Sequence, residues 1–275
     1  MSLEEYLDAA GTVPIPPYFH RDAEASDKEA YNNVYAEAGG SVAAPTAGLH
    51  FTQALLKEIG AAEQQGDNNC SFLSLHVGAG TFKPVLVLDA RDHSMHAETF
   101  SVSVAEIHRI ISAIEKGKPI MAVGTTSSRT LESLYWCGVK RMRGLAESDP
   151  SCLVLGQFEW VPLMVGEGKS ASRRRALKAL VEGLEDSEFV CGKTSLMIVP
   201  GTYDFKVVDH LVTNFHAPDS TLLLLVSALL NKNGDEVASM YEEAQRNGIK
   251  ISFLWRRLHD VSAVSRISWT KAGHQ

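Results

Sequence analysis

The segment 220–231 places the tightest constraint on how this chain folds. Residues 222–230 are all apolar except Ser227. A helix of this composition is apolar on nearly every side, so other elements have to cover it on nearly every side. We therefore expect a helix over 220–231, capped by Asp219 or Ser220, in the centre of a domain. The apolar run is about half as long as a membrane span needs.

Predicted helices and apolar strands alternate through most of the chain. A short, wholly apolar strand ends at Val123, and an earlier helix carries four isoleucines at helical spacing within 107–114. This alternation indicates an α/β fold with a mainly parallel sheet, covered by helices on both faces. The predicted strands are 71–77, 100–104, 119–123, 196–199 and 211–215, and the other predicted helices are 27–37, 52–65, 126–136 and 171–184.

Two regions depart from this alternation. Residues 1–27 contain closely spaced prolines, which exclude helix and interior strand, and we interpret them as an extended lead-in. The α/β domain is predicted to follow over 28–248. Within it, residues 138–192 contain the basic clusters 140–143 and 173–175, and we interpret this region as a basic insertion.

Composition narrows the class of protein. The formal net charge of −7 argues against coating nucleic acid through bulk positive charge, although local contacts to RNA stay open. The first residues are acidic and lack an apolar core, so they resemble no secretory or transit signal. The four cysteines form no C-x-x-C pair, so we interpret them as reduced thiols in a soluble, cytoplasmic protein.

The stretch 123–129 is a candidate anion site. A buried strand passes through Gly124 into hydroxyl side chains that open a helix. The free backbone N–H groups and positive end of such a helix favour a carboxylate or phosphate, and Arg129 adds a bidentate donor. The alternative is an ordinary Thr and Ser helix cap, with Arg129 paired to Glu132 one turn on.

Two further segments place polar groups where ligands of α/β sheets bind. In 43–51, small residues allow close backbone approach, and His50 and Phe51 offer an acid/base group and a stacking face. In 211–221, a strand delivers Asn214 to its carboxyl end beside the start of a helix. The alternative for His50 is a loop histidine that caps a neighbour.

Histidines and acids also gather in 92–98. His93 and His96 lie three residues apart beside Asp92 and Glu98, which is the composition of a metal site without a specific metal motif. Substrate contacts and plain loop histidines are the alternatives. Residues 75–82 form a strand end with two glycines and an aromatic residue.

Taken together, these segments resemble one family, the S-adenosylmethionine:tRNA ribosyltransferase-isomerases of the queuosine pathway. The resemblance runs in order from residue 11 to about residue 244. Its length makes it specific, although no single motif in it is. The matching stretches are 13–18, 31–35, 40–51, 75–85, 93–98, 122–133, 200–201, 206–209 and 211–227.

The resemblance implies a reaction and its partners. The family transfers and isomerises the ribosyl moiety of S-adenosylmethionine onto 7-aminomethyl-7-deazaguanine in tRNA with a GUN anticodon. The products are epoxyqueuosine, adenine and methionine, and no metal is required. This chemistry needs a base, an acid that protonates departing adenine, and a stacking slot. Histidine suits both proton transfers near neutral pH.

The resemblance also assigns candidate residues. Phe51, Phe82 and Phe215 are candidate stacking faces, and the hydroxyls after Gly124, with Arg129, would hold the methionine carboxylate or an RNA phosphate. The basic clusters would contact tRNA, the alternative being a solvated helix face. The catalytic candidates are His216, His96 and His50, with Glu98 as their carboxylate partner. The substrate-binding candidates are Pro45, Thr46, Gly48, Phe51, His76, Gly78, Gly80, Thr81, Phe82, Thr125, Thr126, Ser127, Arg129, Asn214 and Phe215.

The chain also departs from the family pattern. The family has a small β-barrel domain that we expect to be largely absent here, and its Gly-Asp motif is missing from 241–257. Residues 249–275 form a divergent tail. The alternative function is therefore a truncated, catalytically inactive member that only binds a nucleoside. A metal-dependent hydrolase built on Asp92, His93 and His96 is a third hypothesis.

Overall fold

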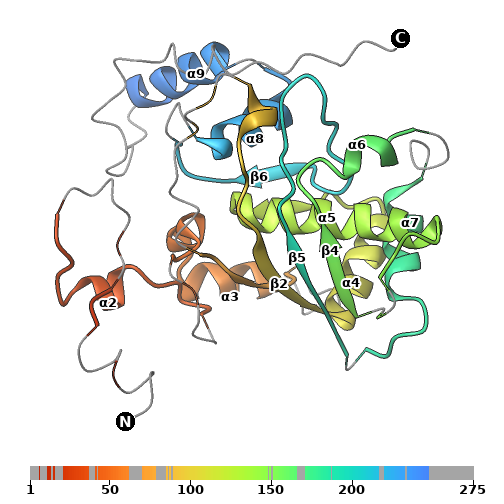
Figure 1. The fold of residues 1–275 in the computed structure, drawn as a ribbon. Coiled ribbons are helices and arrows are strands. Elements are labelled where there is room, and N and C mark those ends of the chain that lie inside the picture. The colour runs from red at the N-terminus through yellow and green to blue at the C-terminus, as the bar shows by residue number, and fades with distance from the viewer. Residues whose placement is uncertain are drawn as a thin grey trace.

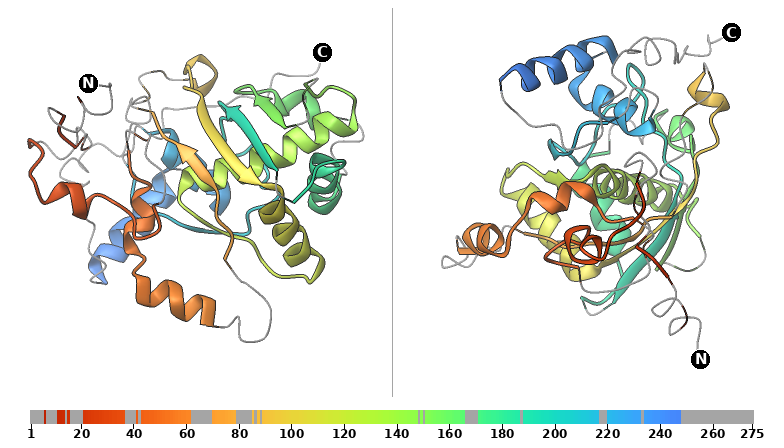
Figure 2. Two further views of the ribbon diagram at one scale, coloured as in Figure 1. Left: turned by 90° about the horizontal axis from the view of Figure 1, so that it is seen from below. Right: turned by 90° about the vertical axis from the view of Figure 1, so that its left-hand side faces the viewer.

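The computed structural model shows a mixed α/β protein (Figure 1). It contains a four-stranded sheet, a separate two-stranded sheet and helices packed against both (Figures 1 and 2). The structure describes residues 6, 11–13, 15, 21–36, 41, 43–61, 70–78, 85, 87, 89–147, 149, 151–165, 171–186, 188–216, 220–232 and 234–247.

The four-stranded sheet has the order β1 (Ser74–His76), β2 (Glu98–Ser103), β5 (Phe189–Thr194), β4 (Cys152–Leu155). Strand β2 runs antiparallel to β1 and β5, whereas β4 runs parallel to β5. Buried and exposed residues alternate along β4 and β5. One face of this sheet therefore packs on the core and the other faces outward, as antiparallel pairing permits.

Two helices, α4 (Val104–Glu115) and α5 (Thr125–Met142), pack against the inner face, and α7 (Arg173–Val181) packs against both of them. Helices α5 and α7 approach so closely that a Cβ on Gly138 would collide with the backbone carbonyl of Ala176.

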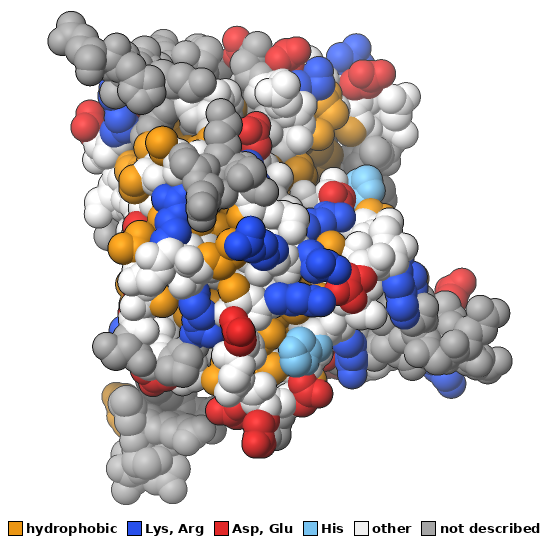
Figure 3. All heavy atoms as spheres, turned by 90° about the vertical axis from the view of Figure 1, so that its right-hand side faces the viewer, with side chains coloured by type: hydrophobic (Ala, Val, Ile, Leu, Met, Phe, Trp, Pro, Cys, Tyr) orange, Lys and Arg blue, Asp and Glu red, His pale blue; other side chains and the backbone are white. Residues whose placement is uncertain are grey.

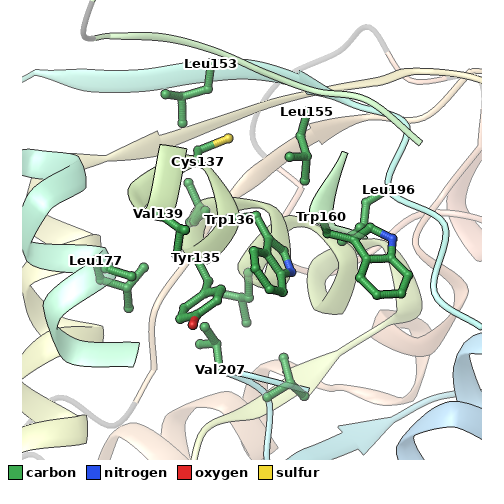
Figure 4. Packing of buried hydrophobic residues seen from close by; sticks show 14 of the residues in the cluster. Tyr135, Trp136, Cys137, Val139, Leu153, Leu155, Trp160, Leu177, Leu196 and Val207 are labelled. Carbon is green, nitrogen blue, oxygen red and sulfur yellow. The ribbon is translucent and has the colours of Figure 1, made fainter. Parts of the chain in front are cut away.

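Aromatic rings fill the core beside these helices. Figure 4 shows Trp136 of α5 and Trp160 of α6 (Trp160–Leu163) side by side, with Leu155 of β4 above them in the same cluster. The Trp160 ring meets the Tyr203 ring edge-on at 4.9 Å. Each large side chain buried here contributes about 1.5–3 kcal/mol.

The two-stranded sheet pairs β3 (Met121–Val123) with β6 (His210–Val212) in parallel. Helix α8 (Thr221–Leu230) follows and packs against α9 (Gly234–Arg246). The Ser220 hydroxyl caps α8 by accepting from the Leu223 N–H, and the left-handed Asn231 ends the helix. The remaining elements are α2 (Asp27–Ala30), η2 (Thr46–His50), α3 (Gln53–Ala61) and η5 (Ala90–Asp92).

The prediction for the apolar helix is confirmed. Leu224 and Leu225 belong to the main core, whereas Leu223 and Val226 belong to a second cluster with Val237 of α9. The helix is apolar all round because it lies between two clusters.

The prediction of a mainly parallel sheet covered on both faces is not confirmed. Among the described strands, two pairs are parallel and two are antiparallel. The outward residues of β2, β4 and β5 are mostly exposed. Apolar composition located strands, but it carries no information about the direction in which they pair.

The basic insertion is not confirmed either. Residues 138–192 supply the end of α5, then β4, α6, α7 and the start of β5. Leu177 and Leu180 of α7 lie in the main core, so only the outward side of that helix is basic. The basic residues lie on one face of an amphipathic helix, so they do not describe the whole segment.

Other local predictions differ in detail. Residues 196–199 are buried but pair in no strand, and the helix predicted over 27–37 ends at Ala30. The helix predicted over 126–136 continues to Met142. The predicted tail, 249–275, lies outside the described residues, and the division into a lead-in and a domain stays a prediction.

Candidate functional site

The carboxyl ends of β3 and β6 bring two of the predicted motifs together. The strands are parallel, and the Gly124 N–H donates to the Val212 carbonyl at 2.8 Å. The segments that follow, 124–129 and 213–216, therefore emerge at the same edge. The loop 43–51 reaches this edge as well, because a Cβ on Gly124 would lie 4.0 Å from the Cβ of Ala47.

His50 and Asn214 join two of these segments. The His50 Nε2 lies 2.5 Å from the Asn214 Oδ1, and the contact is exposed. An amide oxygen can only accept, so Nε2 carries the proton and Nδ1 is left as an acceptor in the neutral ring. The pair is an accessible polar group at the edge, as expected if either residue contacts a ligand.

A buried chain of charges connects this edge to β2. The Arg129 Nη2 lies 2.9 Å from the Glu98 Oε2, and the other oxygen, Oε1, lies 3.4 Å from the His96 Nε2. The Glu98 side chain is fully buried, Arg129 is 3% exposed and His96 is 25% exposed. Charge is thus compensated inside, while an imidazole reaches the surface.

The alternative prediction of an Arg129–Glu132 pair is wrong. The Glu132 carboxylate instead accepts from the Tyr203 hydroxyl at 2.8 Å and from three backbone N–H groups, those of Lys206, Val207 and Val208, at 2.8–3.0 Å. Burial raises the pKa of Glu132, and these hydrogen bonds oppose that shift. Glu132 therefore holds the loop 203–208, a role that no local sequence signal indicates.

The start of α5 lacks a side-chain cap. Its N-cap is Gly124, with φ 93° and no side-chain hydrogen bond, so the predicted Thr and Ser cap is not confirmed. Thr125 and Thr126 are buried, and Ser127 is half-buried. Without a capping side chain, the first N–H groups of the helix remain oriented toward the edge.

His216 lies at the same edge but is buried. Its Nε2 lies 2.7 Å from the Thr213 hydroxyl. Burial lowers the pKa of His216 to about 4, so its ring is neutral at pH 7. Beside it, the Phe215 ring meets the Tyr241 ring of α9 edge-on at 4.5 Å. Phe215 is therefore partly committed to packing against α9.

A small pocket adjoins the charged chain. It lies beside the start of α8, and its room is close to that of one water molecule. The Nε of Arg129 is buried without a hydrogen bond in the described part of the chain. The lining residues are Met95, Arg129, Leu196, Met197, Ile198, Thr221, Leu222 and Leu225.

Other predicted residues surround the edge. The Ser41 hydroxyl, just before the loop 43–51, accepts from the Val77 N–H at 2.9 Å, directly after β1. His76 and Gly78 lie there, and Gly48 is packed against the Tyr35 hydroxyl. Pro45, Thr46 and Phe51 belong to the same loop and are half-buried, whereas Gly80, Thr81 and Phe82 lie outside the described residues.

The metal hypothesis gains no support. Burial lowers the pKa of His93. Within the residues that the structure describes, no three His, Cys, Asp or Glu side chains are grouped to hold a metal ion.

The basic cluster 140–143 serves the interior. Lys140 is buried and pairs with Glu147 at 3.0 Å and Glu159 at 2.8 Å. Arg143 donates to the carbonyls of Leu163 and Val165 near the end of α6. These side chains are already engaged, so they are poor candidates for an RNA surface.

The basic side chains of α7 lie on the surface. Arg174 and Lys178 both pair with Glu115 of α4, at 3.3 and 2.7 Å, and Arg173 pairs with Asp209 at 2.7 Å. Figure 3 shows Lys and Arg side chains gathered on this side of the molecule. Several positive charges remain accessible around a few acids.

Comparisons with known proteins give a consistent family. The sequence matches the family described as queuosine biosynthesis protein over residues 1–253. The S-adenosylmethionine:tRNA ribosyltransferase-isomerase of Halothermothrix orenii is 41% identical over 89% of this chain and 55% of its own length. The protein of the same name from Clostridioides difficile is 39% identical over 88% of this chain and 54% of its own length.

The chain thus spans about half the length of the curated relatives it matches. A crystal structure of an S-adenosylmethionine tRNA ribosyltransferase from Thermotoga maritima matches with 29% identity and a TM-score of 0.41. That match covers 73% of this chain and 46% of that chain. In the part of this chain that the structure describes, every helix is too short or too polar to cross a membrane.

Proposed function

Since this chain belongs to the queuosine biosynthesis protein family, we propose that it carries the ribosyl-transfer site of a tRNA ribosyltransferase-isomerase. The substrates would be S-adenosylmethionine and 7-aminomethyl-7-deazaguanine in tRNA with a GUN anticodon, in the cytoplasm. The products would be epoxyqueuosine, adenine and methionine. The observation that carries this proposal is the meeting of the loop 43–51 with segments 124–129 and 213–216 at one edge.

His96 is the best candidate for proton transfer. Its imidazole is accessible, and its Nε2 lies 3.4 Å from the buried Glu98 carboxylate, which can orient the ring. A catalytic acid or base works best with a pKa near the working pH. The pKa of about 4 makes His216 a weak base, so we assign it a positioning role through its hydrogen bond to Thr213.

The remaining groups suit binding. The uncapped start of α5 offers N–H groups to the methionine carboxylate or to a phosphate. His50 and Asn214 offer an acceptor and donors to a base or ribose. Phe51, next to His50 in the chain, is a stacking candidate, whereas Phe215 packs on Tyr241. The accessible Arg and Lys side chains of α7 are the candidate tRNA contact, because phosphate binding needs local positive charge.

The decisive experiment measures adenine released from S-adenosylmethionine in the presence of tRNA that carries the aminomethyl precursor. Replacement His96→Asn should lower turnover by roughly a hundredfold or more, because a positioned acid or base contributes about that factor. His108→Asn is the matched control, since that histidine is exposed and pairs with Asp186 away from the edge. Equal turnover in both variants would remove His96 from the mechanism.

The alternative, a member that binds a nucleoside without turnover, is tested by the same preparation. Calorimetry with S-adenosylmethionine would then show binding while no adenine is released. Absence of both binding and adenine release would contradict the proposed site.

A further inference from the structure

Two cysteines lie side by side on the open face of the four-stranded sheet. Cys152 of β4 and Cys191 of β5 are register partners on neighbouring parallel strands. Both are exposed free thiols. Because side chains at paired positions point to the same face, both sulfurs are presented outward together. We propose that Cys152 and Cys191 form a dithiol site that binds one thiophilic centre, trivalent arsenic or a soft divalent cation, between two thiolates.

The row of partners continues onto a third strand. Cys191 also pairs in register with Ser101 of β2, and its thiol lies 3.4 Å from the Ser101 hydroxyl. One torsion, the rotation about the Cα–Cβ bond, sets the position of a cysteine sulfur. Rotation about that bond turns the sulfur from Ser101 toward Cys152 while the backbone ladder stays in place.

The spacing favours a bridging atom over a direct disulfide. Neighbouring strands lie about 4.8 Å apart, and paired side chains on parallel strands project nearly parallel to each other. The Cβ atoms of a disulfide lie about 3.5–4.5 Å apart, so a direct bond would draw the two strands slightly together. An atom bonded to each sulfur at roughly 2.3 Å, as in metal–thiolate sites, spans the gap without that shift.

The other cysteines serve as internal controls. Cys137 is buried in the core, and burial raises the pKa of its thiol to about 12, which keeps it protonated and unreactive. Cys70 is half-buried and precedes β1, outside the row of paired positions. The structure therefore distinguishes one pair of thiols, Cys152 and Cys191, from two single ones.

Binding of the arsenical needs no oxidant or reductant. With phenylarsine oxide, the two S–H bonds and the bonds from arsenic to oxygen break, and two As–S bonds form. The oxygen leaves as water with both thiol protons, and arsenic remains trivalent. The second As–S bond closes within one molecule, so the dithiol adduct should be on the order of a hundredfold tighter than a single-thiol adduct.

The test is intact-mass spectrometry of the whole chain after phenylarsine oxide, followed by excess monothiol. The expected result is one adduct that survives monothiol and is removed by a dithiol. It should be lost in Cys152→Ser and in Cys191→Ser, and kept in Cys70→Ser. Cadmium ion added first should compete with the arsenical. Circular dichroism of each variant confirms that the sheet is intact.

Two results would overturn the site. One is an adduct that persists unchanged in both Cys152→Ser and Cys191→Ser, since it would then lie elsewhere. The other is a wild-type adduct stripped by monothiol as readily as in the single-thiol variants. The expected adduct requires only the two thiols, so it is independent of ribosyl transfer.

Discussion

The two buried carboxylates of Glu132 and Glu98 are compensated by different kinds of partner. Both side chains are removed from water, which is costly for a charged group unless partners replace the solvent. Glu132 receives one hydroxyl and three backbone N–H groups, all from the loop 203–208. Glu98 faces a guanidinium on one side and an imidazole on the other.

The difference separates a closed arrangement from an open one. The partners of Glu132 lie inside the core, and the Tyr203 hydroxyl that donates to it also accepts from the Trp136 N–H at 2.8 Å. The chain from Glu98 ends at His96, which is one-quarter exposed. A carboxylate surrounded by backbone donors fixes a loop. A carboxylate that contacts an accessible imidazole can instead orient that ring toward a reacting group.

Removal of the Glu132 carboxylate should have the largest effect on the free energy of unfolding. Glu132→Ala leaves one hydroxyl and three backbone N–H groups without their acceptor, and we expect a loss of about 4 kcal/mol in the free energy of unfolding. Urea unfolding measures it. Glu115→Ala is the matched control, since its surface ion pairs with α7 are worth under about 1 kcal/mol. Equal losses would show that the loop 203–208 does not depend on Glu132.

Burial of the Glu98 carboxylate should depend on its ion pair with Arg129. Arg129→Met leaves the buried charge of Glu98 uncompensated, which should cost about 3 kcal/mol in unfolding free energy. The double variant Arg129→Met with Glu98→Gln removes that charge and should recover much of the loss. The same denaturation experiment reads both. A double variant no more stable than the single one would contradict a direct charge pairing.

Acid should lower the stability of the folded chain through His216, which lies at the edge. Its pKa is lowered from 6.5 in the unfolded chain to about 4 in the folded one, so the unfolded chain binds the proton more readily. This stability is fully present above pH 6.5 and is lost as the pH falls toward 4. Between pH 6.5 and pH 5 the loss should be about 1.5 kcal/mol.

The control for that pH effect is His216→Gln. Urea unfolding at both pH values should show a smaller difference in this variant than in the native chain. If the two proteins lose stability in parallel, other groups account for the acid effect.

The smallest effect belongs to the cap of α8. Ser220→Ala removes the acceptor of the Leu223 N–H and should cost about 1 kcal/mol in unfolding free energy, while Ser220→Asp should retain most of it. Thermal unfolding monitored by circular dichroism measures both. A cost near that of Glu132→Ala would mean that Ser220 does more than cap the helix.

Local patterns predicted several parts of the candidate site. The glycine before Thr125, the polar residues after Leu211 and the histidine loop 43–51 were each identified from residue type and position, and the structure brings them to one edge. The partner of Arg129 was not predictable, because one turn of helix suggested Glu132 and the observed partner lies on β2. Strand direction was missed for a similar reason.

The sequence by itself determined where helices and several strands begin, which helix is central and where polar groups follow strands. These features depend on propensity, capping and periodicity within a few residues. Only the tertiary structure decided strand pairing, the partners of Glu98 and Glu132, and the inward use of Lys140. Such contacts join residues far apart in the chain, and their energies depend on burial and distance, which local composition does not encode.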